Sequence, residues 1–475
     1  MENKVSFKEA VVVLVGMLVV MGLGVIKFGL SPQVPVLLVL VMVTFWARFR
    51  HFSWQDVDNG IKEGIQTGII PIFIFILVGA LISTWIAAGI IPSMMVLGFH
   101  MISAAWFVPS VFVVCALVGT SIGSAFTIIS TVGIAFFGMG MTMGVNPALV
   151  AGAIISGAIF GDKSSPLSDS TNLASAVAGV DLFSHIKNLM WSTIPAFFGS
   201  LILYAILGFH ATASTDMGKI NQTVAVLQSH FSVNIWAVIP VLLMFFCAWK
   251  KIPAIPTLFI NIVVSVVMLF VEHPQTQISN IATVIESGFV SKTGNSSVDA
   301  LLTRGGIASM MGTVSLIVLT LSLGGLLMKF GLIQAIMTPL AKRLNSDGKM
   351  VTATILSGIG VNLFIGEQYL SVILPGKAFK KAYSDTGLAN LALSRVLEDG
   401  GTVINYLVPW GVAGAFAANA LGVPTLHFLP FVFFSLLSPV FSILSAFTGV
   451  GLKHTATATT SEKTQLVSET ESEFD

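Results

Sequence analysis

Long apolar runs separated by short polar stretches recur along almost the whole chain. Such runs cover residues 10–26, 34–47, 69–90, 188–207, 234–249, 255–271, 307–328, 403–420 and 428–447. A helix that crosses a bilayer needs about 20 mostly apolar residues. The first run has no clear small-residue cleavage site, so it is interpreted as a membrane helix and not as a signal peptide. The pattern predicts an all-α polytopic membrane protein with about 11 to 13 transmembrane helices.

Two further apolar runs are interrupted by small and polar residues. The first covers residues 106–140 and contains Gly119-Thr-Ser-Ile-Gly-Ser124. The second covers residues 351–375 and contains Gly358-Ile-Gly360, followed by polar residues that include Glu367. Small residues in the middle of a run favour either an unwound point or hairpin tip, or tight helix packing. The sequence leaves both alternatives open.

The spacing of these interrupted runs indicates an internal repeat. The interval from Ile122-Gly123 to Ile359-Gly360 equals the interval from Asp162 to Asp399. In each half, an interrupted run is followed by a helix that ends in a polar break, an order that suits inverted-repeat transporters. We therefore expect two inverted repeats with broken helices and re-entrant hairpins.

The densest polar stretch, residues 160–172, directly follows an apolar run. It holds two carboxylates, a lysine and several hydroxyl groups, in a chain of which only 9% is charged. Charged groups and unpaired backbone are costly at membrane depth unless they line a cavity or bind a ligand. The stretch is interpreted as an ion or substrate site on a broken helix, with a solvated loop as the alternative.

A second polar break, Glu398-Asp-Gly-Gly-Thr402, supplies the other half of the predicted site. Oxygen ligands suit a hard cation such as Na⁺, and a partly buried carboxylate can carry either Na⁺ or a proton. Asp162, Asp169 and Asp399 are the predicted Na⁺ ligands. The full set of predicted ion- or substrate-binding residues is Asp162, Ser165, Ser168, Asp169, Thr171, Asn172, Glu367, Asp399, Thr402 and Asn405.

Two charged residues beside these positions have an open role. Lys163 either neutralises Asp162 or extends its ammonium group to the membrane interface. Glu398 either joins the site or pairs with Arg395, which precedes it by three residues on a helix. The sequence does not choose between these alternatives.

Composition agrees with an integral membrane protein and excludes several other classes. The chain is 55% hydrophobic, with a mean hydropathy of +0.92 and a net charge of +1, and this balance argues against a nucleic-acid partner. Cys115 and Cys247 both lie in apolar runs, which gives no disulfide framework or zinc spacing. The paired aspartate motifs of membrane proteases and a His-Glu-x-x-His motif do not occur. We therefore expect no enzyme and no cofactor.

The same pattern predicts a domain organisation and a membrane orientation. Residues 1–271 form the expected N-terminal half with the first repeat, residues 272–304 a polar connection, and residues 305–450 the C-terminal half. Residues 451–475 are expected to be a disordered acidic tail. Lysines before the first run predict a multi-pass cell-membrane protein whose N-terminus and tail are cytoplasmic. A homodimer is left open.

The stretch from Gly161 to Ala174 (GDKSSPLSDSTNLA) closely resembles the signature of the NhaC-type sodium/proton antiporter family. Three other regions agree with it: Trp85–Pro92, Ala151–Gly157, and Leu397–Thr402 with Pro409-Trp410. The resemblance implies a bacterial plasma-membrane antiporter with two inverted repeats and paired hairpins. It implies Na⁺/H⁺ exchange by alternating access, with the lipid bilayer, Na⁺ and H⁺ as partners.

The sequence departs from the family pattern mainly in the second half of the predicted site. The family tends to place tryptophan at Ile122, serine at Gly400, Ser-Pro at Asn405-Tyr406, and asparagine at Gly411. These changes affect the substrate more than the transport function. The alternative is therefore an exchanger of organic acids, similar to malate/lactate exchangers, or of amino acids, coupled to Na⁺ or H⁺.

Overall fold

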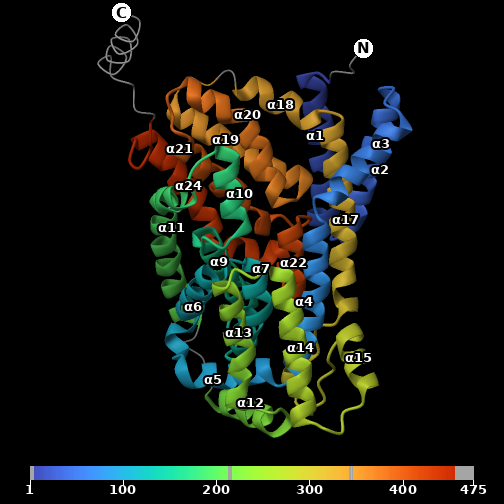
Figure 1. The fold of residues 1–475 in the computed structure, drawn as a ribbon, viewed down its shortest axis with the longest axis vertical. Helices are drawn as coiled ribbons and strands as arrows, with labels where there is room; N and C mark the ends of the chain where they lie inside the picture. Colours follow the sequence, from blue (N-terminus) through green and yellow to red (C-terminus); the bar gives the residue numbers. More distant parts are fainter. Residues whose placement is uncertain (1–4, 212–216, 342–343, 345, 455–475) are drawn as a thin grey trace, which may run out of the picture.

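A computed structural model of the chain describes residues 5–211, 217–341, 344 and 346–454, and these residues form an all-helical protein (Figure 1). By length and composition, seven helices of this described part can cross a membrane, or up to ten if each of three bent pairs is one span. The expected number is higher because it counts shorter apolar helices as well. The predicted all-α polytopic architecture is confirmed.

Eleven α-helices, α1 to α11, come first along the described chain. They are α1 (Phe7–Gly22), α2 (Gln33–Phe49), α3 (Trp54–Gln66), α4 (Ile69–Ala87), α5 (Ile90–Met101), α6 (Phe107–Ile122), α7 (Ala125–Ile128), α8 (Ile134–Thr142), α9 (Pro147–Ser164), α10 (Asp169–Ala178) and α11 (Leu182–Ala211). A π-helical turn, Ile129–Gly133, joins α7 to α8.

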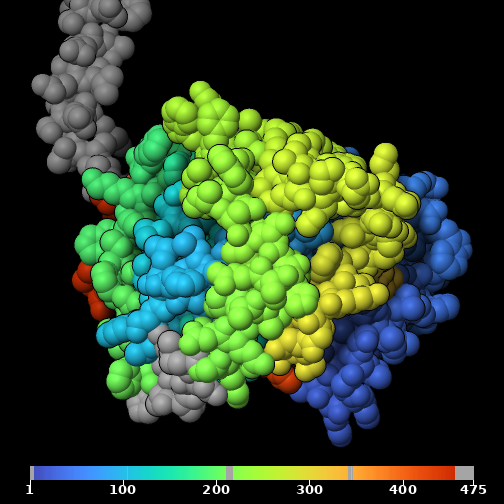
Figure 2. All heavy atoms as spheres, turned by 90° about the horizontal axis from the view of Figure 1, so that it is seen from below, coloured from blue at the N-terminus to red at the C-terminus, as the bar shows by residue number. Residues whose placement is uncertain are grey.

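The remaining helices run from α12 (Met217–His230) to α24, and α12, α13 and most of α14 still belong to the expected N-terminal half. They include α13 (Val238–Trp249), α14 (Ala254–Glu272), α15 (Ile278–Ser287), α16 (Ser296–Leu302), α17 (Ile307–Lys329), α18 (Leu332–Ala341), α19 (Asp347–Ile365), α20 (Gln368–Asp385), α21 (Asn390–Leu397), α22 (Val412–Leu421) and α24 (Phe433–Thr448). Figure 2 shows the lower face of the molecule, which α5 (blue) shares with the lime and yellow segments around α12 and α15.

Each half contains a helical hairpin whose tip is a glycine in the left-handed region. Gly123 (φ +73°) ends α6, and the Ser124 hydroxyl then caps α7. The chain then turns back, so that the end of α8 lies beside the start of α6. A Cβ built on Gly140 would be 3.1 Å from the Phe107 ring. Gly366 (φ +71°) likewise ends α19, before α20 packs back against it. Glycine suits both tips because it adopts positive φ without steric strain.

Each half also contains a broken helix with a proline in the break. The first break joins α9 to α10 and contains Pro166. The second follows α21 through a π-helical turn, Glu398–Thr402, and reaches α22 after Pro409. Proline removes a backbone donor and limits the preceding residue, so both breaks follow from local sequence.

The breaks align in a register that differs from the expected one. The same number of residues separates Gly123 from Gly366, Pro166 from Pro409, and Ser168 from Gly411. The expected match of Ile122-Gly123 with Ile359-Gly360 is wrong, because Gly358 and Gly360 lie inside α19. A Cβ on Gly358 would lie 2.8 Å from the Gly400 carbonyl carbon, so this glycine serves tight helix packing.

The two sets of breaks meet in the middle of the molecule from opposite directions. In Figure 1, α6 lies in the lower half and approaches the centre from below, whereas α19 and α21 lie in the upper half. The Val412 N–H donates to the Gly366 carbonyl at 2.8 Å and joins the second hairpin to its broken helix. Helices α2 and α3 pack on α17, and α14 and α15 pack on α4. This opposed arrangement agrees with the predicted inverted repeats.

The expected connection at residues 272–304 is partly helical, since α15 and α16 lie in it. Asp299 orders its loop by accepting hydrogen bonds from the Ser291 hydroxyl (2.8 Å) and the Thr293 N–H (2.7 Å). Most of the expected acidic tail lies outside the described residues. The division of the chain at this connection stays a prediction.

Candidate functional site

A cavity of about 410 Å³ lies where the first hairpin, the first broken helix, the connection from α13 to α14 and the start of α20 meet. Its wall includes Ser124 and Thr127 from the hairpin and Tyr369 from α20. Asp162 and Asp169 enter it from the two sides of the α9–α10 break. The two carboxylates outnumber the one ammonium group among the described lining residues, that of Lys251, and so favour cations in the cavity. Hydroxyl oxygens beside them are suitable ligands for a hard cation.

The other predicted residues of the first break mostly hold its backbone together. The Thr171 hydroxyl donates to the Lys163 carbonyl at 3.1 Å, and the Ser165 hydroxyl accepts from the Leu167 N–H at 3.2 Å. Ser168 is the N-cap of α10. Asn172 donates to the Ser168 carbonyl at 2.7 Å and also lines the cavity. These side chains satisfy backbone groups that the break frees from helical hydrogen bonds.

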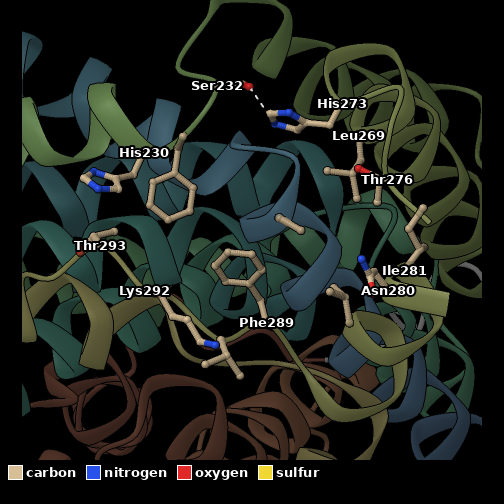
Figure 3. Close-up of a pocket in the computed structure, with 14 residues that line it drawn as sticks. His230, Ser232, Leu269, His273, Thr276, Asn280, Ile281, Phe289, Lys292 and Thr293 are labelled. Carbon is tan, nitrogen blue, oxygen red and sulfur yellow. Dashed lines mark hydrogen bonds between the residues drawn. The ribbon is translucent and has the colours of Figure 1, made fainter. Parts of the chain in front are cut away.

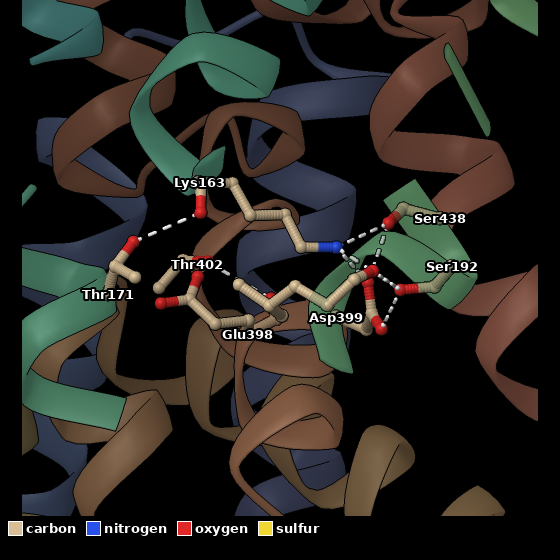
Figure 4. A network of polar contacts seen from close by, with 8 residues as sticks. Lys163, Thr171, Ser192, Glu398, Asp399, Thr402 and Ser438 are labelled. Carbon is tan, nitrogen blue, oxygen red and sulfur yellow. Dashed lines mark hydrogen bonds and ion pairs between the residues drawn. The ribbon is translucent and has the colours of Figure 1, made fainter. Parts of the chain in front are cut away.

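Asp399 lies apart from this cavity, in a buried ion pair with Lys163 (Figure 4). The Lys163 ammonium nitrogen is 2.5 Å from one Asp399 oxygen, and the two side chains are 1% and 0% exposed. The Ser192 and Ser438 hydroxyls donate to the same carboxylate at 2.8 and 2.6 Å. Lys163 therefore neither neutralises Asp162 nor extends to the membrane interface. The ion pair and its two serines join α9, the π-helical turn, α11 and α24.

Glu398 points away from Asp399 (Figure 4) and hydrogen-bonds with the Thr402 hydroxyl. It does not pair with Arg395. The guanidinium group of Arg395 instead donates to the Gly451 carbonyl and the Ser445 hydroxyl, both at 3.1 Å. The helical spacing of Arg395 and Glu398 does not bring them together, because α24 and the loop after it offer Arg395 acceptors on another face.

Glu367 and Asn405 stabilise helix starts in the second half. Glu367 is the N-cap of α20, and its carboxylate accepts from the Leu370 N–H at 2.8 Å. Asn405 donates to the Asn362 side chain at 2.7 Å and accepts from the Ala413 N–H at 3.0 Å. Both side chains are wholly or almost wholly buried. Like Asp399 and Thr402, they lie outside the cavity lining.

Sequence reasoning missed Thr127, Lys251 and Tyr369 in the cavity and Ser192 and Ser438 at the ion pair. Thr127 follows the hairpin tip, which is the one local signal for it. The two serines sit within apolar helices, where a single hydroxyl gives no indication of its partner.

A second cavity, of about 360 Å³, lies elsewhere, around His230, His273 and Lys292 (Figure 3). The Ser232 hydroxyl is 3.4 Å from His273 Nε2. The three charged or titratable side chains are exposed, and the predicted site residues lie outside this cavity.

Opposed hairpins and broken helices inside an apolar helical protein, with an acidic cavity at the first of these breaks, are typical of a secondary active transporter. The model of the Na⁺/H⁺ antiporter family matches residues 157–450. The chain belongs to this family of transporters and is not an enzyme.

Curated relatives match almost the whole chain. The Na⁺/H⁺ antiporter NhaC of Alkalihalophilus pseudofirmus is 38% identical over 95% of this chain and 98% of its own. The arginine/ornithine antiporter ArcD of Halobacterium salinarum is 34% identical over 94% of this chain and 93% of its own. The malate-2H⁺/Na⁺-lactate antiporter of Bacillus subtilis is 34% identical over 90% and 92%. The resemblance to NhaC-type antiporters is confirmed.

Proposed function

We propose that the protein exchanges Na⁺ for H⁺ across the membrane by alternating access. The observation that carries this proposal is the acidic cavity at the helix breaks, in a chain related to NhaC along its length. A cavity bounded by a hairpin tip and a broken helix can open to either side when one half of the transporter moves against the other.

In this mechanism Na⁺ and protons compete for the carboxylates of Asp162 and Asp169. Neutral oxygens of Ser124, Thr127 and Asn172, which line the same cavity, complete the ligand set. A cavity that holds either the cation or protons, but does not move empty, produces exchange. Asp399 is engaged by Lys163 in this conformation, so we assign it no place among the Na⁺ ligands.

A second candidate function is exchange of a small organic solute coupled to Na⁺ or H⁺. A cavity of about 410 Å³ is larger than a bare cation needs. The relatives named as arginine/ornithine and malate/lactate antiporters share this chain's length and family. Two carboxylates in the lining favour a substrate with an ammonium group over an organic dianion.

The protein is a multi-pass membrane protein, and we propose that both termini are cytoplasmic. The first and last described helices have their free ends at the upper end of Figure 1. Lys8 and Arg48 at the ends of α1 and α2, together with Lys329 and Lys349, support this orientation through the excess of basic residues expected on the cytoplasmic side.

The test uses purified protein in liposomes that contain a pH-sensitive dye. An imposed acid-inside gradient is challenged with Na⁺, K⁺ or Li⁺, and then with arginine, ornithine, malate and lactate. We expect Na⁺ to dissipate the gradient, and Asp162→Asn and Asp169→Asn to abolish the response. Asp58→Asn, at an exposed position of α3, is the matched control and should transport normally.

If only an organic solute dissipates the gradient, the second function replaces the first. If Asp162→Asn and Asp169→Asn both transport Na⁺ at the normal rate, the cavity is not the cation site.

A further inference from the structure

A line of buried polar side chains follows the contact between α11, α21 and α24, away from the cavity. We call it the polar seam, and it comprises His185 and Ser192 of α11, Ser394 of α21, and Ser435, Ser438 and Ser442 of α24. All six side chains are fully buried. The α24 serines recur at spacings of three and four residues, which places them on one helix face, whereas the opposite face of α24 exposes Val440 and Leu444.

The seam joins the protein surface to the buried ion pair. At one end, His185 lies in the first turn of α11 between the exposed residues Ser184 and Lys187, and its Nδ1 is 2.8 Å from the Ser394 hydroxyl. Towards the centre, Ser192 and Ser438 hydrogen-bond with Asp399.

Several polar atoms of the seam have no partner within the described chain. They are His185 Nε2 and the hydroxyl oxygens of Ser435 and Ser442. Buried polar atoms in proteins are nearly always hydrogen-bonded, to protein or to water, and an unpaired one costs several kilocalories per mole in an apolar medium. A serine in a helix can satisfy itself on the carbonyl four residues earlier, but these two hydroxyls make no such bond. Water is the partner that remains.

The spacing along α24 suits single bridging waters. Four residues of α-helix rise about 6 Å, so Ser438 and Ser442 lie about two hydrogen bonds apart along the axis. Each hydroxyl and each water is both donor and acceptor. A proton can therefore pass along the line, since each transfer breaks one O–H or N–H bond and forms the next, with no other reactant.

We infer that the polar seam holds water and conducts protons between the surface near His185 and the buried Lys163–Asp399 pair. Lys163 is the chain neighbour of Asp162, so the protons that compete with Na⁺ for the cavity carboxylates arrive by the seam, whereas Na⁺ enters the cavity directly. This inference rests on the proposed Na⁺/H⁺ exchange. It gives the two ions separate routes to the centre of the protein. A dry seam that only packs small residues is the structural alternative, and the two differ in what a methyl group at Ser442 does.

The test separates Na⁺ movement from proton movement in the same liposomes. Exchange of radioactive Na⁺ against unlabelled Na⁺ needs the cavity alone, whereas Na⁺/H⁺ exchange also needs the seam. We expect Ser442→Val to slow Na⁺/H⁺ exchange at least about tenfold and to leave Na⁺/Na⁺ exchange unchanged. Ser265→Val is the matched control, because Ser265 of α14 is equally buried but donates to the Asn261 carbonyl at 2.7 Å.

His185→Gln is the second variant, and it keeps a polar group beside Ser394 while it removes the relay nitrogen. His185→Gln replaces Ser442→Val as the test if Ser442→Val shows no Na⁺/Na⁺ exchange, which would indicate that Ser442→Val has not folded. Equal slowing of both exchanges by His185→Gln, or Na⁺/H⁺ exchange at the wild-type rate in either folded variant, would overturn the inference. If the wild-type protein moves no protons with Na⁺, the proposed function fails first, and the seam fails with it.

Discussion

Replacement of Lys163 by methionine tests the energetic role of the buried ion pair. The change keeps most of the side-chain volume but leaves the Asp399 carboxylate without its cation. Ser192 and Ser438 still donate to that carboxylate. Two hydroxyl donors do not compensate a full charge in a site that is 0% exposed.

The magnitude follows from the burial of both partners. Removal of one member of a buried pair typically costs about 3–5 kcal/mol, because the other charge stays buried and uncompensated. Such a loss lowers the folded-to-unfolded ratio roughly a hundredfold or more. The double variant Lys163→Met/Asp399→Asn buries no charge, and we expect it to recover most of the lost stability. The amide oxygen at position 399 of this variant can still accept a hydrogen bond from the Ser192 or the Ser438 hydroxyl.

The assay is equilibrium unfolding in mixed micelles of mild detergent and SDS, which gives a free energy of unfolding. Lys329→Met is the matched control, because Lys329 pairs with Glu63 at 2.8 Å but both side chains are partly exposed. A surface pair of this kind contributes about 0–1 kcal/mol. The reasoning is refuted if Lys163→Met is as stable as Lys329→Met, or if the double variant is no more stable than Lys163→Met.

Two further predictions concern helix packing and a loop. Gly161→Ala should destabilise the protein by about 1–3 kcal/mol, because the new Cβ would lie 2.4 Å from the Gly119 Cα. Gly16→Ala is the control, since a Cβ there meets no atom within 4 Å. Equal unfolding midpoints of the two variants would contradict the prediction. Hydrogen bonds, first from the Thr293 N–H, hold the pKa of Asp299 below its ordinary value of 3.8. The stability that this carboxylate contributes is present above that value and lost as pH falls through the lower folded pKa. Asp299→Asn should therefore weaken the acid dependence of the unfolding midpoint, and an unchanged dependence would refute the assignment.

Sequence alone located the elements whose cause is local. The apolar runs became helices because an apolar segment in lipid must satisfy its own backbone. The polar stretch at residues 160–172 became a helix break because Pro166 and several polar side chains interrupt an otherwise apolar run. Gly123 became a hairpin tip because it accepts the left-handed conformation without strain. Each feature depends on a few neighbouring residues, so the chain shows where it lies, although the sequence left a hairpin tip and tight packing open at Gly123.

The register of the repeat could not be read in the same way. The sequence analysis matched Gly123 with Gly360, whereas the glycine at the second hairpin tip, which has a positive φ, is Gly366. Gly358, two residues before Gly360, lies against the backbone of Gly400, a residue distant in sequence. A glycine needed for conformation and one needed for close packing look alike in a sequence, because the difference is the neighbour that each one meets.

Sequence by itself determined the membrane class, the helix breaks, and the presence of carboxylates beside them. Tertiary structure decided which carboxylate faces which partner. Asp162 and Asp169 share a cavity, whereas Asp399 lies against Lys163, 236 positions away, with serines from two further helices. The sequence is compatible with several pairings of Lys163 with the carboxylates of the two helix breaks. Packing selects among them, because a buried charge is stable only where the folded chain brings its counter-charge and hydrogen-bond donors within reach.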